Sequence, residues 1–248
     1  MKLSAVVITK NEEENIQECL ELLDFADEQI VIDDKSTDKT RVIAEEFGAR
    51  IFKHDLNDNY AGQRNFGLSN AKGKWVIFID ADERVDKVLA NEIKGVVSGK
   101  GEYSGYRIKR EDVLWGRRIK YGEPGYTWLV RLGLREKGSW RRKVHEVWEI
   151  EGEVGKLNNS IKHYPHNDLS KFVNSINQYS SIHAKENMRE GKVSGIFKIM
   201  FYPPLKFIDN IIIKLGILDG VYGFVIAFMM SFHSFLSWSK LWLYQRKD

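Results

Sequence analysis

The chain has 248 residues, of which 43% are hydrophobic and 12% are aromatic, and its formal net charge is +3. This length and composition can supply a large buried core. They exclude a disordered tail or a small disulfide scaffold, and they predict one large domain or one domain with an appendage. The single cysteine, Cys19, excludes an internal disulfide and a zinc site made of thiolates. So small a net charge gives no reason to expect a nucleic-acid partner.

The N-terminal residues MKLSAVVITKNEEE do not have the pattern of a secretory signal peptide. Their apolar run ends at Thr9, and acidic residues follow where a cleavage site of small residues would be expected. We therefore expect a protein of the cytoplasm, where reducing conditions also suit a lone cysteine.

Up to about residue 100, short apolar runs alternate with helical patterns. Asn11 and Glu14 form a capping-box pattern ahead of the first helix. Strands alternating with helices predict a parallel sheet with right-handed crossovers, as in a Rossmann-like α/β domain. The apolar runs are rich in β-branched residues and are typical of strands buried on both faces; they cover residues 4–9, 29–33, 49–52 and 74–80.

Beyond residue 100 the runs YSGYRIKR and YTWLVRLG predict antiparallel strands added to the sheet. An amphipathic helix is expected to begin near Asp168, and Pro203 and Pro204 are expected to break any helix. We expect a catalytic domain over residues 1–190 and a C-terminal helical, membrane-associated segment over residues 191–248. The apolar face of the Asp168 helix is expected to contain Phe172, Ile176, Tyr179 and His183.

Residues 220–239 carry no formal charge. A helix of about 20 residues, rising ~1.5 Å per residue, would just cross the ~30 Å hydrocarbon core of a bilayer. Basic residues stand on both sides of the segment, so charge does not choose an orientation. The segment fits a hairpin at the membrane surface, a transmembrane span, or a helix pair buried in a core or a dimer.

Residues 107–143 contain twelve basic side chains against four acidic ones. This local excess predicts a surface for an anionic partner, although a solvated face is the alternative for each single residue.

Acidic residues follow the apolar runs that end at residues 33 and 80. Parallel sheets bind ligands beyond the carboxyl ends of their strands. Asp80 and Asp82 suit a hard divalent cation such as Mg or Mn, although acids at this place could also cap a helix. Asp33 and Asp34 could accept hydrogen bonds from a base or a ribose. Two acidic sites on one sheet edge favour a nucleotide diphosphate as ligand. We interpret Glu83 and Asp86 as the start of the next helix.

Four blocks carry a family resemblance: VVITKNEEENI, IDDKSTDKT, AGQRNFGL and FIDADE. Their order and spacing resemble the family 2 glycosyltransferases with the GT-A fold, and the later KVHE resembles the bacterial branch that adds sugars to lipopolysaccharide core. The resemblance covers roughly residues 3–184. It implies a mostly parallel, Rossmann-like sheet flanked by helices, with added antiparallel strands and a C-terminal helical appendage.

The same resemblance implies a nucleotide-sugar pocket. Asp33 or Asp34 would hold a uracil base. Arg64 would meet a phosphate or brace Asp80, and its neighbours could instead cap a helix. Asp80-Ala81-Asp82 resembles the DxD signature, with Asp82 the direct metal ligand and Asp80 nearer the ribose. The residues implied to bind the nucleotide sugar are Thr9, Asn11, Glu12, Asp33, Asp34, Gln63, Arg64, Asn65 and Asp80.

An inverting transfer needs a carboxylate opposite the leaving diphosphate to take the acceptor's proton. By resemblance this base is Glu146, with a surface salt bridge as the alternative. His145 and Arg142 are expected to contact the acceptor, although His145 could instead fill a core hydrogen bond. His163 is the candidate third metal ligand beside Asp82 and Asp80, with a plain polar loop as the alternative.

Together these features predict an inverting, metal-dependent glycosyltransferase that moves a hexose from a nucleotide sugar, such as UDP-glucose, to lipopolysaccharide core or another lipid-linked glycan. It would work on the inner face of the cytoplasmic membrane. The sequence lacks the Gln-x-x-Arg-Trp block of processive synthases, so addition of a single sugar is expected. The alternatives are a sugar nucleotidyltransferase or a non-catalytic nucleotide-sugar-binding protein of the same fold.

Overall fold

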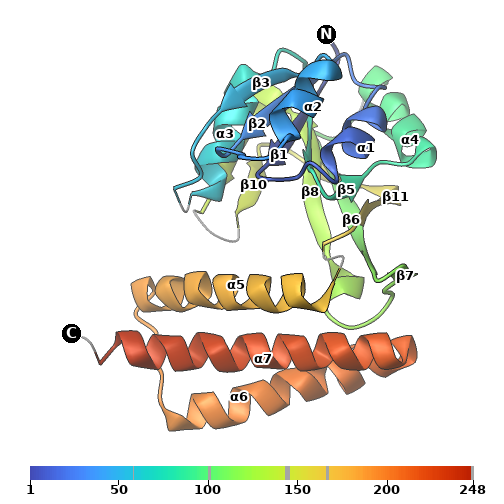
Figure 1. Cartoon of the computed structure of the whole chain (residues 1–248). Coiled ribbons are helices and arrows are strands. Elements are labelled where there is room, and N and C mark those ends of the chain that lie inside the picture. Colours follow the sequence, from blue (N-terminus) through green and yellow to red (C-terminus); the bar gives the residue numbers. More distant parts are fainter. Residues whose placement is uncertain (58, 100–101, 143–145, 166–167, 247–248) are drawn as a thin grey trace. The chain divides into compact units, whose positions relative to one another are not determined.

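The computed structural model describes residues 1–57, 59–99, 102–142, 146–165 and 168–246 (Figure 1). Contacts divide the chain into two compact units. The first comprises Met1–Arg110 and Trp128–His163, and the second comprises Glu111–Thr127 and Tyr164–Asp248. The helix that begins after Asp168 therefore belongs with the C-terminal helices, whereas the sequence suggested a boundary at residue 190. A functional boundary at residue 190 stays a prediction.

The first unit is built on a parallel core of four strands, as predicted. β1 lies between β2 and β4 and is parallel to both, so that Val6 stands opposite Ile30 on one side and Phe78 on the other. β3 extends the parallel order beyond β2. Each strand begins and ends within one residue of its expected place: β1 (Leu3–Thr9), β2 (Glu28–Asp33), β3 (Arg50–Lys53) and β4 (Trp75–Asp80).

Antiparallel strands extend this core beyond β4. The sheet runs in the order β3-β2-β1-β4-β8-β6-β11-β5, with β8 antiparallel to β4 and to β6. The antiparallel additions expected from YSGYRIKR and YTWLVRLG are thus confirmed. β9 and β10 form a separate hairpin, and β7 pairs with β6. The added strands are β5 (Glu83–Arg84), β6 (Gly105–Leu114), β7 (Arg117–Arg118), β8 (Trp128–Leu134), β9 (Gly138–Arg141), β10 (Val147–Ile150) and β11 (Val154–His163).

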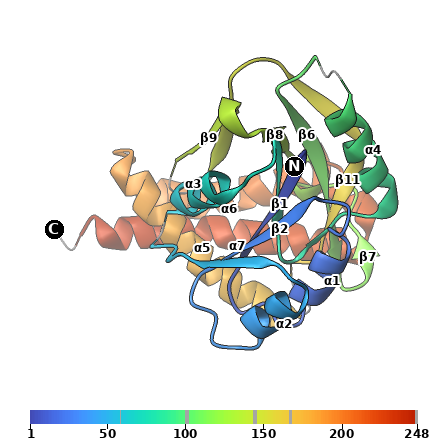
Figure 2. The same cartoon turned by 90° about the horizontal axis from the view of Figure 1, so that it is seen from above.

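Helices cover both faces of the parallel strands (Figure 2). Successive strand residues point to opposite faces, so Val7 packs with α1, α2 and α4, whereas Val6 packs with α3 and the β9–β10 hairpin. Trp140 and Trp148 of this hairpin stack on each other and meet Phe78 edge-on. The helices are α1 (Ile16–Glu21), α2 (Thr40–Glu46), α3 (Tyr60–Asn70) and α4 (Lys87–Ser98).

Two local expectations near the sheet edge need correction. The first helix begins at Ile16 after Asn15, and Asn11 has a left-handed φ of 54° in the preceding loop, so the capping box at Asn11 is wrong. Glu83 does not start a helix, because it lies in β5, a short strand that pairs with β11. Asp86 does start the next helix, as expected: its carboxylate accepts hydrogen bonds from the N–H groups of Val88 and Leu89.

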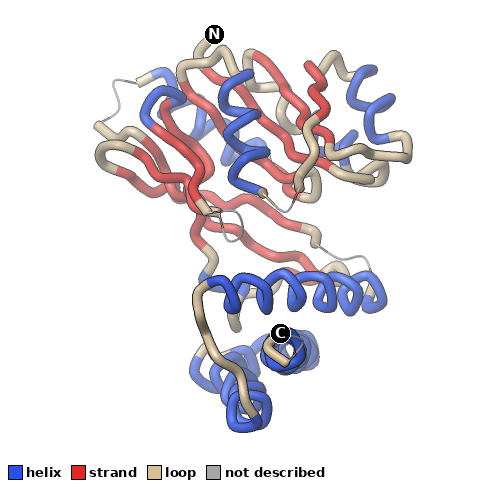
Figure 3. The backbone as a smooth tube through the Cα atoms, turned by 90° about the vertical axis from the view of Figure 1, so that its left-hand side faces the viewer, coloured by secondary structure: helices blue, strands red, loops and turns tan. Residues whose placement is uncertain are grey.

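The C-terminal part of the second unit is helical (Figure 3). α7 packs against both α5 and α6. On α5, Phe172 and Ile176 contact Met229 of α7, but Tyr179 is 54% exposed and lies outside this face. By length and composition α7 alone among the described helices could cross a membrane, and one such helix is weak evidence. The helices are α5 (Leu169–Arg189), α6 (Ile196–Ile208) and α7 (Val221–Tyr244), with a π-helical turn (Asp209–Ile213) and a 3-10 turn (Gly216–Asp219) between α6 and α7.

The sequence predicts a helix break at Pro203 and Pro204, but α6 continues through both prolines. Each proline removes one helix hydrogen bond, but its fixed φ is close to the helical value, so a helix can continue where packing offsets the loss. Pro203 is the buried residue of α6, which packs on α7, and the hydroxyl of Ser231 donates to its carbonyl oxygen. Packing between the two helices therefore stabilises α6 through the prolines.

The close fit of α3 on the sheet gives a test of the fold. A Cβ at Gly67 would lie 2.7 Å from Cγ1 of Val6 and 3.2 Å from Cγ1 of Ile32. We expect Gly67→Ala to lower the free energy of unfolding by about 1–3 kcal/mol through overpacking. Gly95, on the exposed side of α4, has open space around it, so Gly95→Ala should raise the free energy of unfolding by about 0.5–1 kcal/mol. Urea unfolding would measure both values, and equal signs would contradict the packing described for α3.

Candidate active site

Asp33 is the last residue of β2 and Asp34 follows it, and neighbouring loops fix both side chains. Asp34 accepts hydrogen bonds from Nζ of Lys10 at 2.8 Å and from the N–H of Leu56 at 3.0 Å. Burial would raise the pKa of Asp34, but the ammonium of Lys10 and these hydrogen bonds outweigh it and lower the pKa. Asp33 accepts from the N–H of Ser36. The two carboxylates therefore have fixed positions at the carboxyl end of β2.

The loop after β1 is tied to the loop after β2. The side-chain oxygen of Asn11 accepts from the N–H of Thr37 at 2.8 Å, and Glu12 accepts from the side-chain amide of Asn15 at 2.7 Å. Burial raises the pKa of Glu12. Thr9 is buried, and its hydroxyl has no hydrogen-bond partner within the described ranges. A buried polar atom without a partner is unusual in a folded protein.

Asp80, at the end of β4, lies between two arginines. Its Oδ1 accepts from Nη2 of Arg64 at 2.9 Å, and its Oδ2 accepts from Nη2 of Arg131 at 2.7 Å. Arg131 also donates to Glu83 at 2.9 Å, and Arg64 donates through Nε to Glu146 at 3.0 Å. The result is a chain of alternating charges, named here the charge chain: Glu83, Arg131, Asp80, Arg64 and Glu146.

Electrostatics in the charge chain follow from burial and pairing. Burial would raise the pKa of Asp80, but the two guanidinium groups outweigh it and hold that pKa far below its usual range. Burial raises the pKa of Glu83, which is fully buried and also accepts from the N–H of Asp80 at 2.9 Å. Burial would lower the pKa of Arg131, but the carboxylates of Asp80 and Glu83 raise it. Arg131 and Asp80 are therefore both held in their charged forms.

Asp82 and His163 form a second pair beside the charge chain. Nε2 of His163 lies 3.2 Å from Oδ2 of Asp82, because β11 pairs with β5 and brings His163 opposite Glu83. Among the described residues no group of three or more His, Cys, Asp or Glu side chains is arranged to hold a metal ion. A carboxylate oxygen and an imidazole nitrogen are nevertheless suitable donors for a divalent ion. Other ligands would then complete its coordination.

Gln63 and Asn65 lie inside α3, so a helix-cap role for them is wrong. The cap is Asn59, whose side chain accepts from the N–H of Gly62 at 3.0 Å. Gln63 donates to the carbonyl oxygen of His54, and Asn65 exchanges two hydrogen bonds with the backbone of Trp140 at 2.8 and 2.9 Å. These contacts fix the β9–β10 hairpin to α3. The ring of Trp140 in turn lies 4.8 Å from the guanidinium carbon of Arg64, a cation–π distance.

Of the two residues predicted to contact the acceptor, the structure describes only Arg142. His145 lies outside the described residues. Arg142 is exposed, with a left-handed φ of 68°. Glu146 is described, and its side chain is 19% exposed while Oε1 is bound to Arg64.

Arg131 and Glu83 are the site residues that sequence reasoning missed. Arg131 was counted in the basic surface of residues 107–143, but it is 3% exposed. The alternation in YTWLVRLG contains a usable signal, since a charged residue in the middle of an apolar strand must find a buried partner. Glu83 lies with Arg84 in the short strand β5 and contacts Arg131 of β8 only in the folded sheet. No local sequence pattern therefore indicates its role.

The charge chain predicts a strong stability effect at Arg131. Arg131→Met would leave Asp80 and Glu83 short of a buried counter-charge, which typically costs about 3–5 kcal/mol of unfolding free energy. Adding Glu83→Gln should recover part of that loss, with a coupling of about 0.5–3 kcal/mol in a double-mutant cycle. Arg141→Met is the control, because Arg141 and its partner Glu149 are both mostly exposed, and this surface pair contributes under about 1 kcal/mol. Additive losses at Arg131 and Glu83 in chemical denaturation would refute the pairing.

Solved structures similar to this one are glycosyltransferases and a related synthase. A crystal structure of residues 1–349 of TarS from Staphylococcus aureus superposes with a TM-score of 0.51 at 14% identity, covering 100% of this chain and 92% of that one. A crystal structure of glucosyl-3-phosphoglycerate synthase from Mycobacterium tuberculosis, in complex with Mn²⁺, UDP-glucose and phosphoglyceric acid, gives a TM-score of 0.50 at 17% identity. That alignment covers 78% of this chain and 81% of the synthase. These similarities show the GT-A fold.

Sequence comparison identifies the family. Over 254 residues the chain is 31% identical to the lipopolysaccharide core biosynthesis glycosyltransferase LpsC of Rhizobium meliloti (strain 1021), covering 99% of this chain and 93% of LpsC. Residues 4–148 match the family described as Glycosyl transferase family 2. The resemblance found in the four sequence blocks is thus confirmed, and a sugar nucleotidyltransferase is not supported. The chain belongs to glycosyl transferase family 2 and is a glycosyltransferase.

Proposed function

We propose that this glycosyltransferase moves one hexose, with inversion, from a UDP-sugar such as UDP-glucose to lipopolysaccharide core or another lipid-linked glycan. The observation that carries the proposal is the link from Asp80 through Arg64 to Glu146, beside the pair of Asp82 and His163. It joins the end of β4, where a donor sugar would lie, to a carboxylate that can act as base. A lipid-linked acceptor would place the reaction at the cytoplasmic face of the membrane.

The donor's nucleotide would bind at the carboxyl ends of β1 and β2, with Asn11 and Glu12 in the loop beside it. Asp34 is held by Lys10 and Leu56, yet a carboxylate has about four lone-pair positions, so it can also accept from the N–H of a uracil. The hydroxyl of Thr9 has no partner in the described part of the chain and lies at the end of the same edge. The synthase from Mycobacterium tuberculosis, crystallised with UDP-glucose on the same fold, supports UDP as the nucleotide.

Asp82 and His163 would hold a divalent ion, Mn or Mg. When bound, the ion would neutralise negative charge on the departing diphosphate. Asp80 is a poorer ligand in this arrangement because each of its oxygens accepts from an arginine. Its role would be to orient Arg64 and to receive a ribose hydroxyl.

Glu146 would act as the general base. Arg64 holds Oε1, and Oε2 has no partner among the described residues, so Oε2 can take the proton of the acceptor hydroxyl. The acceptor oxygen then bonds to the anomeric carbon as the bond from that carbon to the diphosphate breaks. The ion pair with Arg64 would fix the orientation of the Glu146 carboxylate. Proton transfer requires a fixed orientation, because the base must lie within hydrogen-bond reach of the acceptor hydroxyl.

Replacing Asp82 tests the metal assignment. We expect Asp82→Asn to lower transfer and slow donor hydrolysis by about 100-fold or more, because several kcal/mol of leaving-group stabilisation would be lost. The measurement is UDP release from a panel of UDP-sugars with Mn or Mg. Asp86→Asn is the matched control, since asparagine caps a helix about as well as aspartate and activity should persist. Unchanged metal-dependent activity in Asp82→Asn would refute the assignment.

Replacing Glu146 tests the base. Glu146→Gln should reduce transfer by about 10²–10⁴-fold while the dissociation constant for UDP stays the same. Glu149→Gln, three residues later on β10 and paired only with exposed Arg141 among the described side chains, should leave both quantities unchanged. Calorimetric titration with UDP, run beside the transfer assay, separates the two effects. If Glu146→Gln weakened UDP binding and left the rate at saturation intact, the base would have to be sought elsewhere.

A further inference from the structure

The solvent-exposed side of α6 is apolar along its whole length. Residues on this side recur at the spacing of one helix face, and their exposed fractions range from 46% to 75%. The lysines of α6 are only partly exposed, at the flanks of this face. This arrangement is the reverse of an ordinary surface helix, which turns its apolar side inward. The exposed residues are Ile196, Phe197, Met200, Phe201, Leu205 and Ile208.

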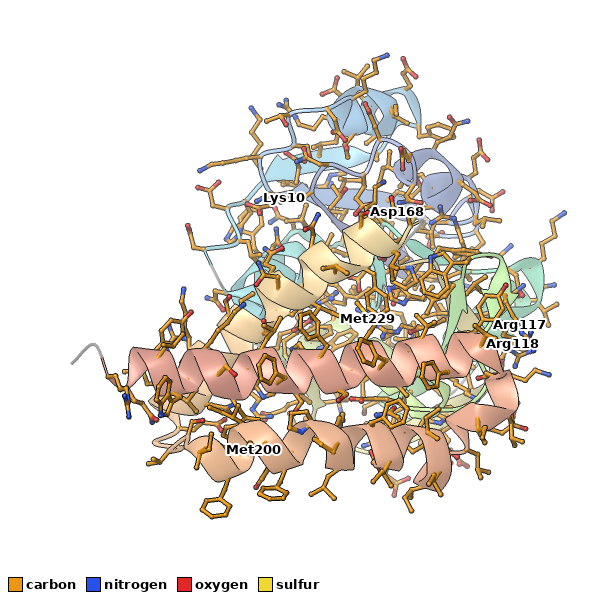
Figure 4. All side chains as sticks on the ribbon, turned by 60° about the horizontal axis from the view of Figure 1, so that its bottom comes forward. Lys10, Arg117, Arg118, Asp168, Met200 and Met229 are labelled. Atoms are coloured by element: carbon orange, nitrogen blue, oxygen red, sulfur yellow. The ribbon has the colours of Figure 1, made fainter. Side chains whose placement is uncertain are left out.

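The same surface continues through the turn into the first half of α7. Figure 4 labels Met200 on α6 and Met229 on α7; Met200 is 59% exposed, whereas Met229 is 6% exposed and packs against α5. We name the whole surface the hairpin apolar face. Soluble monomers rarely expose a contiguous apolar patch of this extent. Beyond α6 the face comprises Ile212, Ile213, Leu215, Ile217, Leu218, Val221, Phe224 and Phe228.

The turn of this hairpin is fixed by polar contacts within the second unit. Asp219 is buried and accepts from the N–H groups of Lys120 and Tyr121 at 3.0 and 2.9 Å. Asn210 is also buried, and its side-chain oxygen accepts from the N–H of Glu123 at 2.9 Å. The apolar side chains between these anchors are therefore displayed on a structured surface.

α5 gives an internal comparison for this composition. Its exposed side mixes lysine, arginine, asparagine and glutamine side chains with Leu169, Val173, Tyr179 and Met188. Phe172 and Ile176 face inward, as expected of a helix at a protein–water boundary. The exposed side of α5 is thus mixed in polarity, whereas the exposed residues of α6 and of the turn are mainly apolar. The polar exposed residues of α5 include Lys171, Asn174, Gln178, Lys185 and Arg189.

Charge around the hairpin complements an anionic surface. Residues 191–246 contain six basic side chains and two acidic ones, a local net charge of +4. Lys192, Lys206 and Lys214 pair with Glu190, Glu123 and Asp209, and Asp219 is buried under backbone N–H groups. Lys198 and Arg246 have no acidic partner among the described residues and are the cations most available to an anionic surface. Long basic side chains at the edge of an apolar face can reach lipid headgroups while their stems stay in apolar surroundings. The six are Lys192, Lys198, Lys206, Lys214, Lys240 and Arg246.

α7 packs against α5 and α6 in the second unit, so we do not expect it to cross a bilayer alone. Its Ile226, Ala227 and Met229 are buried in the unit. Nζ of Lys240 donates to the backbone and side-chain oxygens of Asn177 and to the hydroxyl of Ser180 on α5. Spanning would either separate these contacts or carry the polar α5 into hydrocarbon, which is strongly unfavourable.

We propose that the hairpin apolar face lies in one leaflet of an anionic phospholipid bilayer, with α6 and α7 in the membrane plane, so that the chain rests on the membrane and does not span it. This inference rests on the proposed function only for the choice of a membrane as partner. The surface that binds and its orientation come from the contacts of the second unit. A binding assay measures no transfer, so the two proposals can fail separately.

Vesicle flotation tests the surface. The full chain should float with vesicles of phosphatidylethanolamine and phosphatidylglycerol, float less with phosphatidylcholine alone, and stay bound in high salt once the apolar face is inserted. Phe197→Glu with Leu205→Glu should reduce the bound fraction by about tenfold or more. The matched control, Val42→Glu with Val88→Glu, puts the same charge on exposed valines of α2 and α4 and should float like the unchanged chain.

Folding and UDP release without vesicles should be the same in all three proteins, because every replaced side chain is exposed and none belongs to the active site. Unimpaired flotation of the Phe197/Leu205 variant would overturn the proposal. It would equally be overturned if the unchanged chain ignored vesicles and formed a dimer that this variant separates, since the face would then bind a second copy.

Labelling decides between lying on the membrane and crossing it. Cys19 is buried, so Arg246→Cys would provide a single reactive thiol near the end of α7. A membrane-impermeant maleimide added to intact vesicles should label residue 246 fully, because the proposal leaves both ends of α7 on the outer side. Labelling that requires detergent would show a span and overturn the in-plane arrangement.

Discussion

The candidate active site depends on Asp80 being held between Arg64 and Arg131. A partly buried carboxylate loses hydration, and the two guanidinium groups offset that cost by binding one oxygen each. The same contacts join three segments far apart in sequence, namely α3, β4 and β8. Through Arg64 the constraint extends to Glu146, and through Arg131 to Glu83. Local misplacement at any member would therefore be transmitted to the others.

Sequence alone predicted the parts of this site that lie next to their own strand. Val6, Ile30 and Phe78 sit in apolar runs whose strand character is local, and the acids that follow them fall at the sheet edge by topology. Arg131 and Glu83 could not be placed in this way. Their pairing needs β8 beside β4 and β5 beside β11, which are long-range pairings that no short pattern encodes. From the sequence alone, Arg131 is therefore predicted to be one of the exposed basic residues of 107–143.

The C-terminal helices show the same division. Composition identified an uncharged stretch in residues 220–239 but left its environment open, because hydrocarbon and a helix partner both favour apolar side chains. The partner became visible only with Phe172 and Ile176 of α5 against Met229. Likewise Pro203 predicts a helix break by its local chemistry, whereas in the structure it lies inside α6 and its carbonyl oxygen accepts from Ser231 of α7. The contacts of α7 with α5 and α6 are tertiary information that no local pattern in the sequence contains.

Charge balance around Asp80 gives the physical reason for a divalent ion in the proposed reaction. The carboxyl groups of Asp80, Asp82, Glu83 and Glu146 outnumber the guanidinium groups of Arg64 and Arg131, four against two. A nucleotide diphosphate brings further negative charge to the same edge of the sheet. Repulsion in this partly buried region would oppose binding, since screening by water is weak there. A cation between Asp82 and the diphosphate would remove that repulsion, while Arg64 and Arg131 remain engaged in holding Asp80 and Glu146 in place.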